Sequence, residues 1–247
     1  MALFIRLILQ VKSMPNIILK DLHIKRFKGI KDLFFDELVG INILVGRSNS
    51  GKTTVLEAIK DMNDSVPVEL ISPCCILDEK QQAQLLAKSI KAERKNDILE
   101  LISSIDSDIV DIDVSTTGLN ENSIMVTHKE LGTLLLHSMG HGFRVMLAIA
   151  LTAINLHQGI LLIDDFYMFT DPDVMSIFIP WLILHTKAQL FIATHDLEVI
   201  SDFVHNSSDD NRLVLYRLLG LKTSKMVKAY QDRVHRVIHE MGLDIRY

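Results

Sequence analysis

Short apolar runs alternate along this chain with longer segments whose apolar residues recur at helical spacing. Four runs have the length and composition of buried strands, at 41–45, 160–163, 189–193 and 213–218. Helical periodicity occupies the segments between them, at 54–62, 143–156, 173–185 with a kink at Pro180, and from 198 to 204. Strands that alternate with helices predict an α/β fold with a mostly parallel core sheet.

The pattern outside this core is more varied. Two strands at 19–27 and 31–35 predict an N-terminal antiparallel β part. Residues 65–75 contain two prolines and predict a loop or a short irregular strand. Further elements are expected as a charged helical insert at about 78–105, short strands at 109–114, 123–127 and 133–137, and a C-terminal amphipathic helix at about 222–241.

One loop between a predicted strand and a predicted helix carries a phosphate-binding pattern. It reads G-x-x-x-x-G-K-T and consists of Gly46, Arg47, Ser48, Asn49, Ser50, Gly51, Lys52 and Thr53. The glycines allow a tight turn that aims backbone N–H groups at phosphate oxygens, and the following helix adds its positive amino end. Lys52 can reach the β- and γ-phosphates, and the Thr53 hydroxyl can bind Mg²⁺. The loop therefore predicts a nucleotide site.

Polar residues also follow two other predicted strands. Asp164 and Asp165 come directly after the run at 160–163, and His195 follows the run at 189–193. Parallel strands present their carboxyl ends at one edge of a sheet, where ligands bind. We expect Asp164 to hold Mg²⁺, Asp165 to polarise the attacking water and His195 to contact the γ-phosphate. The alternatives are that the aspartates only cap a surface strand and that the histidine is structural.

Composition narrows the class of protein. Of the 247 residues, 48% are hydrophobic and 23% are charged, which is ordinary for a globular protein with a sizeable core. The formal net charge is −5, so any contact with DNA requires a local basic patch. The two cysteines, Cys74 and Cys75, are adjacent and no C-x-x-C pair occurs, which fits a reducing, cytoplasmic location.

The amino-terminal residues 1–11 are apolar but too few to span a bilayer, which takes about 20 apolar residues. We therefore expect no membrane contact. Residues 1–18 are expected to be an N-terminal extension, within which Met14 is a second candidate start, and residues 19–247 are expected to form a single domain.

The order of these motifs resembles the ATP-binding-cassette (ABC) type of P-loop ATPase, in the branch that includes SMC, RecF-like and OLD-family proteins. Residues 24–30 are similar to its opening strand motif and residues 42–59 to its phosphate loop. Residues 138–144 are similar to its signature, residues 161–172 to its Walker B region and residues 192–196 to its switch histidine. The signature resembles the S-x-G-x-G-x-x-R of OLD-like proteins, with Arg144 one position early. The resemblance covers nearly the whole chain from about residue 19.

This resemblance implies an ATPase with Mg²⁺ as cofactor, in which two heads sandwich two ATP molecules. The signature residues Ser138, Gly140 and Gly142 would contact the ATP bound to the other subunit. Further nucleotide-binding residues would be Arg26, Lys28 and Thr54. The implied partners are a second copy of the chain, an effector protein such as a nuclease, and DNA through local basic patches. By analogy, the process is genome maintenance or antiviral defence.

The sequence departs from that family in ways that affect activity. Asp165 stands where a glutamate is usual, and its side chain is shorter by about 1.5 Å, so turnover is expected to be slow or to need a partner. The usual His-Pro pair reads Asp171-Pro172. The insert is too short for a long coiled-coil arm, because its helix would reach only about 40 Å. A glutamine near magnesium is expected in the insert, with Gln81, Gln82 and Gln84 as candidates.

Two side-chain clusters and two other functions remain open on the sequence. Lys88, Lys91 and Lys95 would share one helix face, as a phosphate-contacting stripe or a solvated surface. His235, His239 and Glu240 fit a metal site or the surface of an amphipathic helix. The alternatives to a Mg²⁺-dependent ATPase are a non-hydrolysing, ATP-dependent scaffold and a transporter ATPase subunit. The S-x-G-x-G signature, in place of LSGGQ, argues against the transporter subunit.

Overall fold

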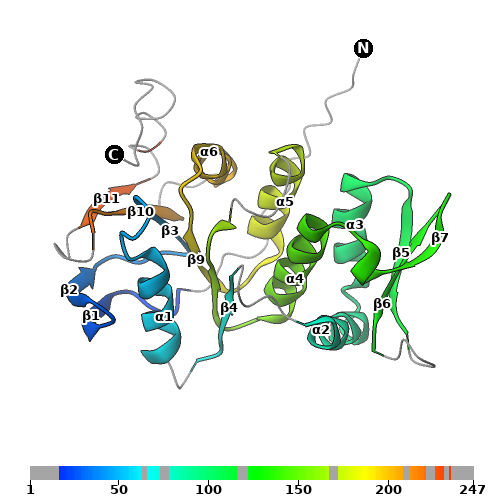
Figure 1. The fold of residues 1–247 in the computed structure, drawn as a ribbon, viewed down its shortest axis with the longest axis horizontal. Coiled ribbons are helices and arrows are strands. Elements are labelled where there is room, and N and C mark those ends of the chain that lie inside the picture. Colours follow the sequence, from blue (N-terminus) through cyan, green and yellow to red (C-terminus); the bar gives the residue numbers. More distant parts are fainter. Residues whose placement is uncertain are drawn as a thin grey trace, which may run out of the picture.

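A six-stranded sheet forms the centre of the molecule (Figure 1). The computed structural model describes residues 17–62, 66–72, 78–115, 122–166, 172–207, 212–220, 226–230 and 234. The strands lie in the order β11 (Met226–Tyr230), β10 (Leu213–Leu218), β3 (Ile41–Val45), β9 (Gln189–Ala193), β8 (Ile160–Ile163) and β4 (Val68–Ile71). The pairs from β10 to β4 are parallel and β11 is antiparallel. The predicted α/β fold with a mostly parallel core sheet is therefore confirmed.

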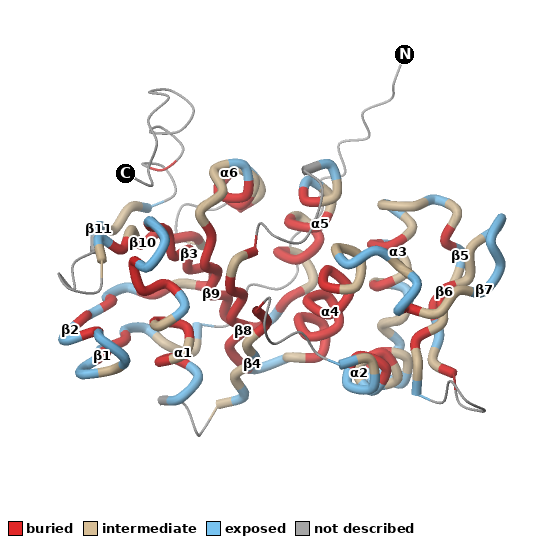
Figure 2. The backbone as a smooth tube through the Cα atoms, viewed as in Figure 1, coloured by how far each residue is buried: buried red, intermediate tan, exposed pale blue. Residues whose placement is uncertain are grey.

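Both faces of this sheet are covered at its centre, which explains why β3, β8 and β9 consist almost entirely of apolar residues. Alternate side chains of β3, β8 and β9 enter two separate hydrophobic clusters. One cluster includes α1 (Lys52–Met62) and the hairpin of β1 (Leu22–Phe27) and β2 (Ile30–Phe35). The other cluster includes α4 (His141–Asn155), α5 (Pro172–His185) and α6 (Leu197–Asn206). Figure 2 shows the buried strands between these two layers.

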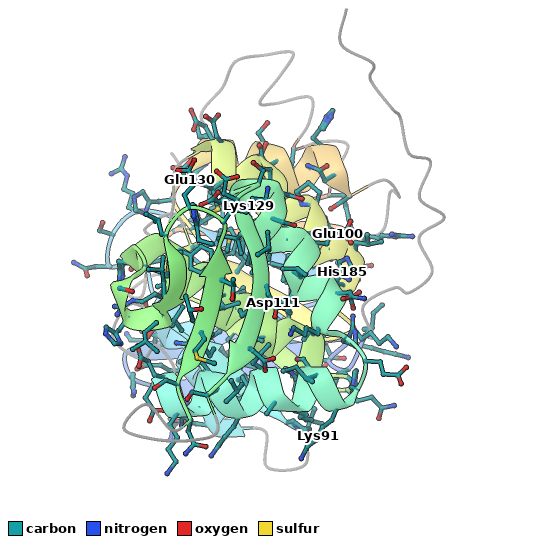
Figure 3. All side chains as sticks on the ribbon, turned by 90° about the vertical axis from the view of Figure 1, so that its right-hand side faces the viewer. Lys91, Glu100, Asp111, Lys129, Glu130 and His185 are labelled. Carbon is teal, nitrogen blue, oxygen red and sulfur yellow. The ribbon has the colours of Figure 1, made fainter. Side chains whose placement is uncertain are left out.

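The helical insert and a small sheet extend the α4 side. α2 (Glu79–Lys91) packs on α4, and α3 (Lys95–Ile105) packs on α5. The small sheet consists of β5 (Ile109–Val114), β6 (Ile124–His128) and β7 (Gly132–Leu135), followed by the short helix η2 (Leu136–Ser138). Figure 3 looks onto this end, where Lys129 and Glu130 mark the β6–β7 turn. In the described part of the chain, no helix has the length and apolarity to cross a bilayer.

The insert is two helices, so the prediction of one helical segment over 78–105 is wrong at its centre. Residues 92–94 break it, and Glu93 has a left-handed backbone with φ of 57°. A glutamate gives no sequence signal for that conformation, which usually falls to glycine. Lys88 and Lys91 therefore end α2 while Lys95 begins α3, and Lys95 pairs with Asp111 at 2.8 Å. The three lysines do not form a stripe on one helix.

The C-terminal helix predicted over 222–241 is wrong at Met226–Tyr230, which forms β11. This segment pairs with β10. Its pairing with the edge of the core sheet therefore decides its structure, although its apolar residues have helical spacing. Its polar side chains also have partners, because Lys228 donates to Asp36 Oδ1 at 3.2 Å and Tyr230 bonds to Glu37. Residues 68–71, expected in a loop or irregular strand, form the regular strand β4. α5 continues through Pro180.

Several predictions fall outside the described residues. These concern the extension up to residue 16, Cys74 and Cys75, Asp171, and the cluster of His235, His239 and Glu240. Their roles stay predictions.

Candidate nucleotide site

The phosphate loop joins β3 to α1, and its backbone has the tight turns that the motif predicts. Gly46 has φ of 149°, and a Cβ there would lie 2.6 Å from both Leu218 O and Ser50 Oγ, so a larger residue does not fit. Gly51 and Asn49 have φ of 101° and 62°. Asparagine is one of the few other residues that adopts this conformation readily. Glycine is therefore required at Gly46 by both space and backbone angle.

The Lys52 side chain is buried against the phosphate loop. Its Nζ donates to Gly46 O at 3.0 Å and to Arg47 O at 3.3 Å. Burial lowers the pKa of this ammonium, while the carboxylates of Asp165 and Asp164 act in the opposite direction. A lysine ammonium surrounded by a loop whose backbone N–H groups point inward can bind anionic oxygens such as those of phosphate.

Asp164 joins the phosphate loop to the end of β8. Thr53 Oγ1 donates to Asp164 Oδ2 at 2.7 Å, across 111 positions of sequence. Burial raises the pKa of the Asp164 carboxyl and the Asp165 charge raises it further, while the Thr53 hydrogen bond and Lys52 lower it. The hydroxyl and the carboxylate thus lie together, as predicted for a Mg²⁺ site.

Asp165 and His195 lie at the same edge of the sheet. Asp165 has φ of 48°, and its N–H donates to Asp164 Oδ1 at 3.1 Å. His195 follows β9, which lies between β3 and β8 in the sheet. The end of β9 is fixed there because Thr194 N donates to Leu44 O at 3.1 Å and Asp196 caps α6. The predicted residues of three strand ends therefore face one edge.

The residues present fit a nucleotide with Mg²⁺. Ser50 Oγ is buried in the phosphate loop and has no hydrogen-bond partner among the described residues. A buried polar atom without a partner costs free energy, so this hydroxyl is poised for an external acceptor or donor. The hydroxyl of Thr53 and the carboxylate of Asp164 are oxygen ligands of the kind that Mg²⁺ prefers. Thr53 and Asp164 could hold the ion.

The proposed signature lies on a separate element. Ser138 ends η2 and donates from Oγ to Leu135 O at 2.6 Å, while Gly140 is the N-cap of α4 and Gly142 is in its first turn. Ser138 and Gly140 are exposed. A Cβ on Gly140 would meet no atom within 4 Å, and its φ of −56° is open to any residue. No residue in the described part of the chain explains a glycine at this position.

Other predicted residues have contacts that suggest additional or different roles. Lys28 pairs with Glu57 of α1 at 3.1 Å, and Arg26 is exposed near the same hairpin turn. Gln81 completes a capping box with Asp78 at the start of α2. Gln82 instead lines a cavity of about 220 Å³ with Glu79, His141 and Arg144. Sequence reasoning missed this cavity because α2 and α4 are far apart in the chain.

A family match covers the second half of this site and the insert. Residues 75–201, about half of the chain, match the family described as "AAA domain, putative AbiEii toxin, Type IV TA system". The chain belongs to this AAA-domain family. Within the chain, the match includes the signature region, Asp164, Asp165 and His195, and the phosphate loop precedes it. The curated protein "Uncharacterized protein MJECL11" of Methanocaldococcus jannaschii is 30% identical over 114 residues, which are 44% of this chain and 99% of that protein.

Solved structures share the fold at low sequence identity. An SMC head bound to the C-winged helix domain of ScpA aligns with a TM-score of 0.59 at 10% identity, over 86% of this chain and 98% of that chain. CbiO1 from Clostridium perfringens, part of the ABC transporter complex cbiONQ, aligns with a TM-score of 0.55 at 13% identity, over 89% of each chain. The protein therefore has the fold of P-loop ATPases of the SMC/ABC type, and the predicted resemblance to that type is confirmed. Its place in the OLD-like branch stays a prediction.

Proposed function

We propose that the protein binds ATP with Mg²⁺ and hydrolyses it, and that ATP holds two copies of the chain together. The observation that carries the ATPase proposal is the hydrogen bond of 2.7 Å between Thr53 and Asp164, beside the buried Lys52. A hydroxyl, a carboxylate and a buried cation at the carboxyl ends of parallel strands are the parts that phosphoryl transfer uses.

Each residue has a defined role in this proposal. The backbone N–H groups of the loop and Lys52 bind the phosphates of ATP, and Ser50 supplies a further hydrogen bond. Thr53 and Asp164 hold Mg²⁺, which supplies positive charge at the phosphates. Asp165 accepts a hydrogen bond from the attacking water and orients it, and His195 contacts the γ-phosphate. Lys52 must exchange its hydrogen bonds to Gly46 O and Arg47 O for phosphate oxygens when ATP enters.

The exposed Gly140 supports the proposal of an ATP-bound homodimer. A glycine that no described residue of its own chain requires is explained by close approach of another molecule. Ser138 and Gly140 also lie at the amino end of α4, whose free N–H groups attract a phosphate. We propose that this end of α4 meets the ATP bound to the second copy. The fold shared with an SMC head bound to a ScpA domain makes a partner protein a reasonable further component.

A substitution of Lys52 tests the ATP site. Lys52→Ala removes the buried cation and should abolish ATP binding, measured by calorimetry, while circular dichroism shows an intact fold. The wild-type protein should release phosphate from ATP only with Mg²⁺. Equal ATP affinity in the two proteins would contradict the site.

A non-hydrolysing scaffold is the second candidate, and the short side chain of Asp165 on a left-handed backbone favours it. The two functions differ in one measurement. If the wild-type protein closes into a dimer with ATP and releases no phosphate above the Asp165→Asn background, the scaffold is correct.

A further inference from the structure

A groove of about 600 Å³ opens at the side of the core sheet away from Asp164. Its walls come from the start of β4, from α2 and from the end of α4, and its lining includes Glu69, Gln84, Leu85, Lys88, Asn155 and His157. We call it the β4 groove. Residues just before β4 and β8 also line it, so it lies at the amino ends of the parallel strands. The candidate nucleotide site lies at their carboxyl ends.

The β4 groove has the chemistry of a site for a peptide backbone. Leu85 and Leu156 provide apolar surface, and Gln84 and Gln158 provide carboxamide groups. A carboxamide carries both a donor and an acceptor, as a peptide unit does. β4 is also the edge strand of the core sheet in the part of the chain that the structure describes. An edge strand offers backbone N–H and C=O groups that can pair with an added strand.

Positive charge gathers at one end of the β4 groove. Burial lowers the pKa of His157, and the charges of Arg94, Lys187 and Lys88 lower it further. Arg94 is paired with Asp97 at 2.9 Å, whereas Lys88 and Lys187 are exposed and neither is paired with a described carboxylate. Among the described residues that line the groove, Glu69 is the one with a carboxylate. The surface around His157, at the end of the groove away from Glu69, therefore carries two lysines without a described carboxylate partner, and it complements a negatively charged partner.

The elements that form the β4 groove also lead to both parts of the candidate nucleotide site. β4 ends at Ile71, whose carbonyl accepts a hydrogen bond of 2.9 Å from Asp164 N. α4 runs from the signature at its amino end to Asn155 in the groove, and Asn155 Nδ2 donates to Ser89 Oγ of α2 at 2.7 Å. An occupant that shifts β4 against α4 would therefore shift Asp164 against the signature.

We propose that the β4 groove binds an extended acidic segment of a partner protein. The segment adds a strand beside β4, places apolar side chains on Leu85 and Leu156, and directs carboxylates toward Lys88 and Lys187. The open strand edge and the carboxamides favour a polypeptide over a nucleic acid, whose phosphates call for a longer row of cations. This inference gives a surface to the partner in the proposed function, and it rests on that function for its coupling to ATP.

Selection from a phage-displayed library of random peptides tests the proposal. Each peptide has roughly twelve residues, which is enough for one strand and a few flanking residues. The full-length chain is the bait. The enriched peptides should alternate acidic and apolar residues. A labelled synthetic copy should bind the wild-type chain in fluorescence anisotropy, and Lys88→Glu with Lys187→Glu should weaken that binding by about tenfold or more. Lys25→Glu with Lys31→Glu, in the β1–β2 hairpin on the other face of the core sheet, changes charge equally and should leave binding unchanged.

Hydrogen exchange locates the peptide. Exchange at residues 68–71 should slow when the peptide is bound, because the β4 edge becomes paired. Enriched peptides without acidic residues, equal binding by the two charge-reversed variants, or protection away from β4 would each overturn the proposal. So would a single-stranded DNA probe that binds the wild-type chain and competes with the peptide, since the surface would then serve a nucleic acid.

Calorimetry with ATP separates this proposal from the proposed function. The Lys88→Glu, Lys187→Glu variant should bind ATP as the wild-type chain does. Peptide binding that depends on Lys88 and Lys187 would uphold the groove even if the wild-type chain failed to bind ATP. Normal ATP binding with no acidic peptide selected would overturn the groove alone.

Discussion

Asp165 combines the shortest acidic side chain with a left-handed backbone at φ of 48°. Aspartate and asparagine adopt this region more readily than other non-glycine residues, because their short polar side chains can hydrogen-bond locally. The backbone at this position therefore favours aspartate over the glutamate that is usual in similar ATPases. A shorter side chain places its carboxylate farther from a water at the γ-phosphate, and a misplacement of ~1 Å can cost on the order of 100-fold in rate.

Substitutions of Asp165 test its role in hydrolysis. Asp165→Asn keeps the shape and the backbone preference but removes the base, so ATP binding should persist while phosphate release falls at least about 100-fold. Asp165→Glu should raise turnover because the carboxylate reaches farther, at a cost of about 1 kcal/mol in folding stability from the left-handed backbone. Steady-state phosphate release and urea unfolding measure the two effects. Turnover of Asp165→Asn at the wild-type rate would assign the base elsewhere.

His185 should make stability depend on pH. Burial lowers the pKa of its ring, and the nearby Arg94 lowers it further, although Asp97 and Glu100 act in the opposite direction. Between the ordinary pKa of 6.5 and this lowered value, the unfolded chain binds a proton that the folded chain does not. The free energy of unfolding should therefore fall as the pH falls through this window, by at most about 1.4 kcal/mol per pH unit.

A phenylalanine at this position checks that contribution. The His185 ring stacks on Trp181 with ring centroids 4.7 Å apart, so His185→Phe keeps the stack but cannot titrate. Urea unfolding from pH 7.5 to pH 5 should show a flatter decline in this variant. An unchanged decline would show that other groups cause it.

At the scale of elements, the amino end of α4 has an N-cap without a side-chain hydrogen bond. Gly140 occupies that position, where Asn, Asp and Ser are the common choices. A Cβ at Gly140 would meet no described atom within 4 Å, so a capping side chain would have room there. A capping side chain here would make the fold more stable, so its absence fits a functional role for this end of α4. We propose that this end contacts the ATP bound to a second copy.

Two caps of equal size separate stability from function at Gly140. Gly140→Asn and Gly140→Asp should each raise the free energy of unfolding by a few tenths of a kcal/mol, because both cap α4. Asp adds a negative charge that repels the γ-phosphate, so it should weaken the ATP-dependent dimer at least about tenfold more than Asn does. Sedimentation with ATP, Mg²⁺ and the Asp165→Asn background measures this. Equal dimerisation of the two variants would remove α4 from the interface.

The elements that the sequence predicts well are those whose environment is uniform. β3, β8, β9 and β10 match the predicted ranges because both faces of each strand are buried, so an apolar run defines the whole strand. The candidate site was predictable for the same reason, since its residues follow directly from strand ends. Contacts that join distant segments were not predictable. Glu93 breaks the insert without glycine, and β11 forms only because β10 offers an open edge.

At the scale of the whole molecule, the candidate site is divided between two regions of the chain. One edge of the core sheet carries Lys52, Thr53, Asp164 and His195. Ser138 lies on η2, which follows the small sheet of β5–β7 in the sequence. A γ-phosphate that touches both regions in different copies would supply the differential contact between an open pair and a closed pair. ADP lacks that group and should not close the dimer.

Mixing two inactive variants tests this division directly. Lys52→Ala removes the phosphate-loop cation, and Ser138→Arg places a bulky side chain at the signature, so each homodimer has two defective sites. A mixed dimer can join the intact loop of one chain to the intact signature of the other and form one complete site. If half of the dimers are mixed, about a quarter of the wild-type activity should return, by the statistics of independent sites. Phosphate release measured across mixing ratios should be highest near equal amounts. If mixing restores no activity, and the Asp165→Asn protein stays monomeric with ATP and Mg²⁺, the chain does not build its site from two copies.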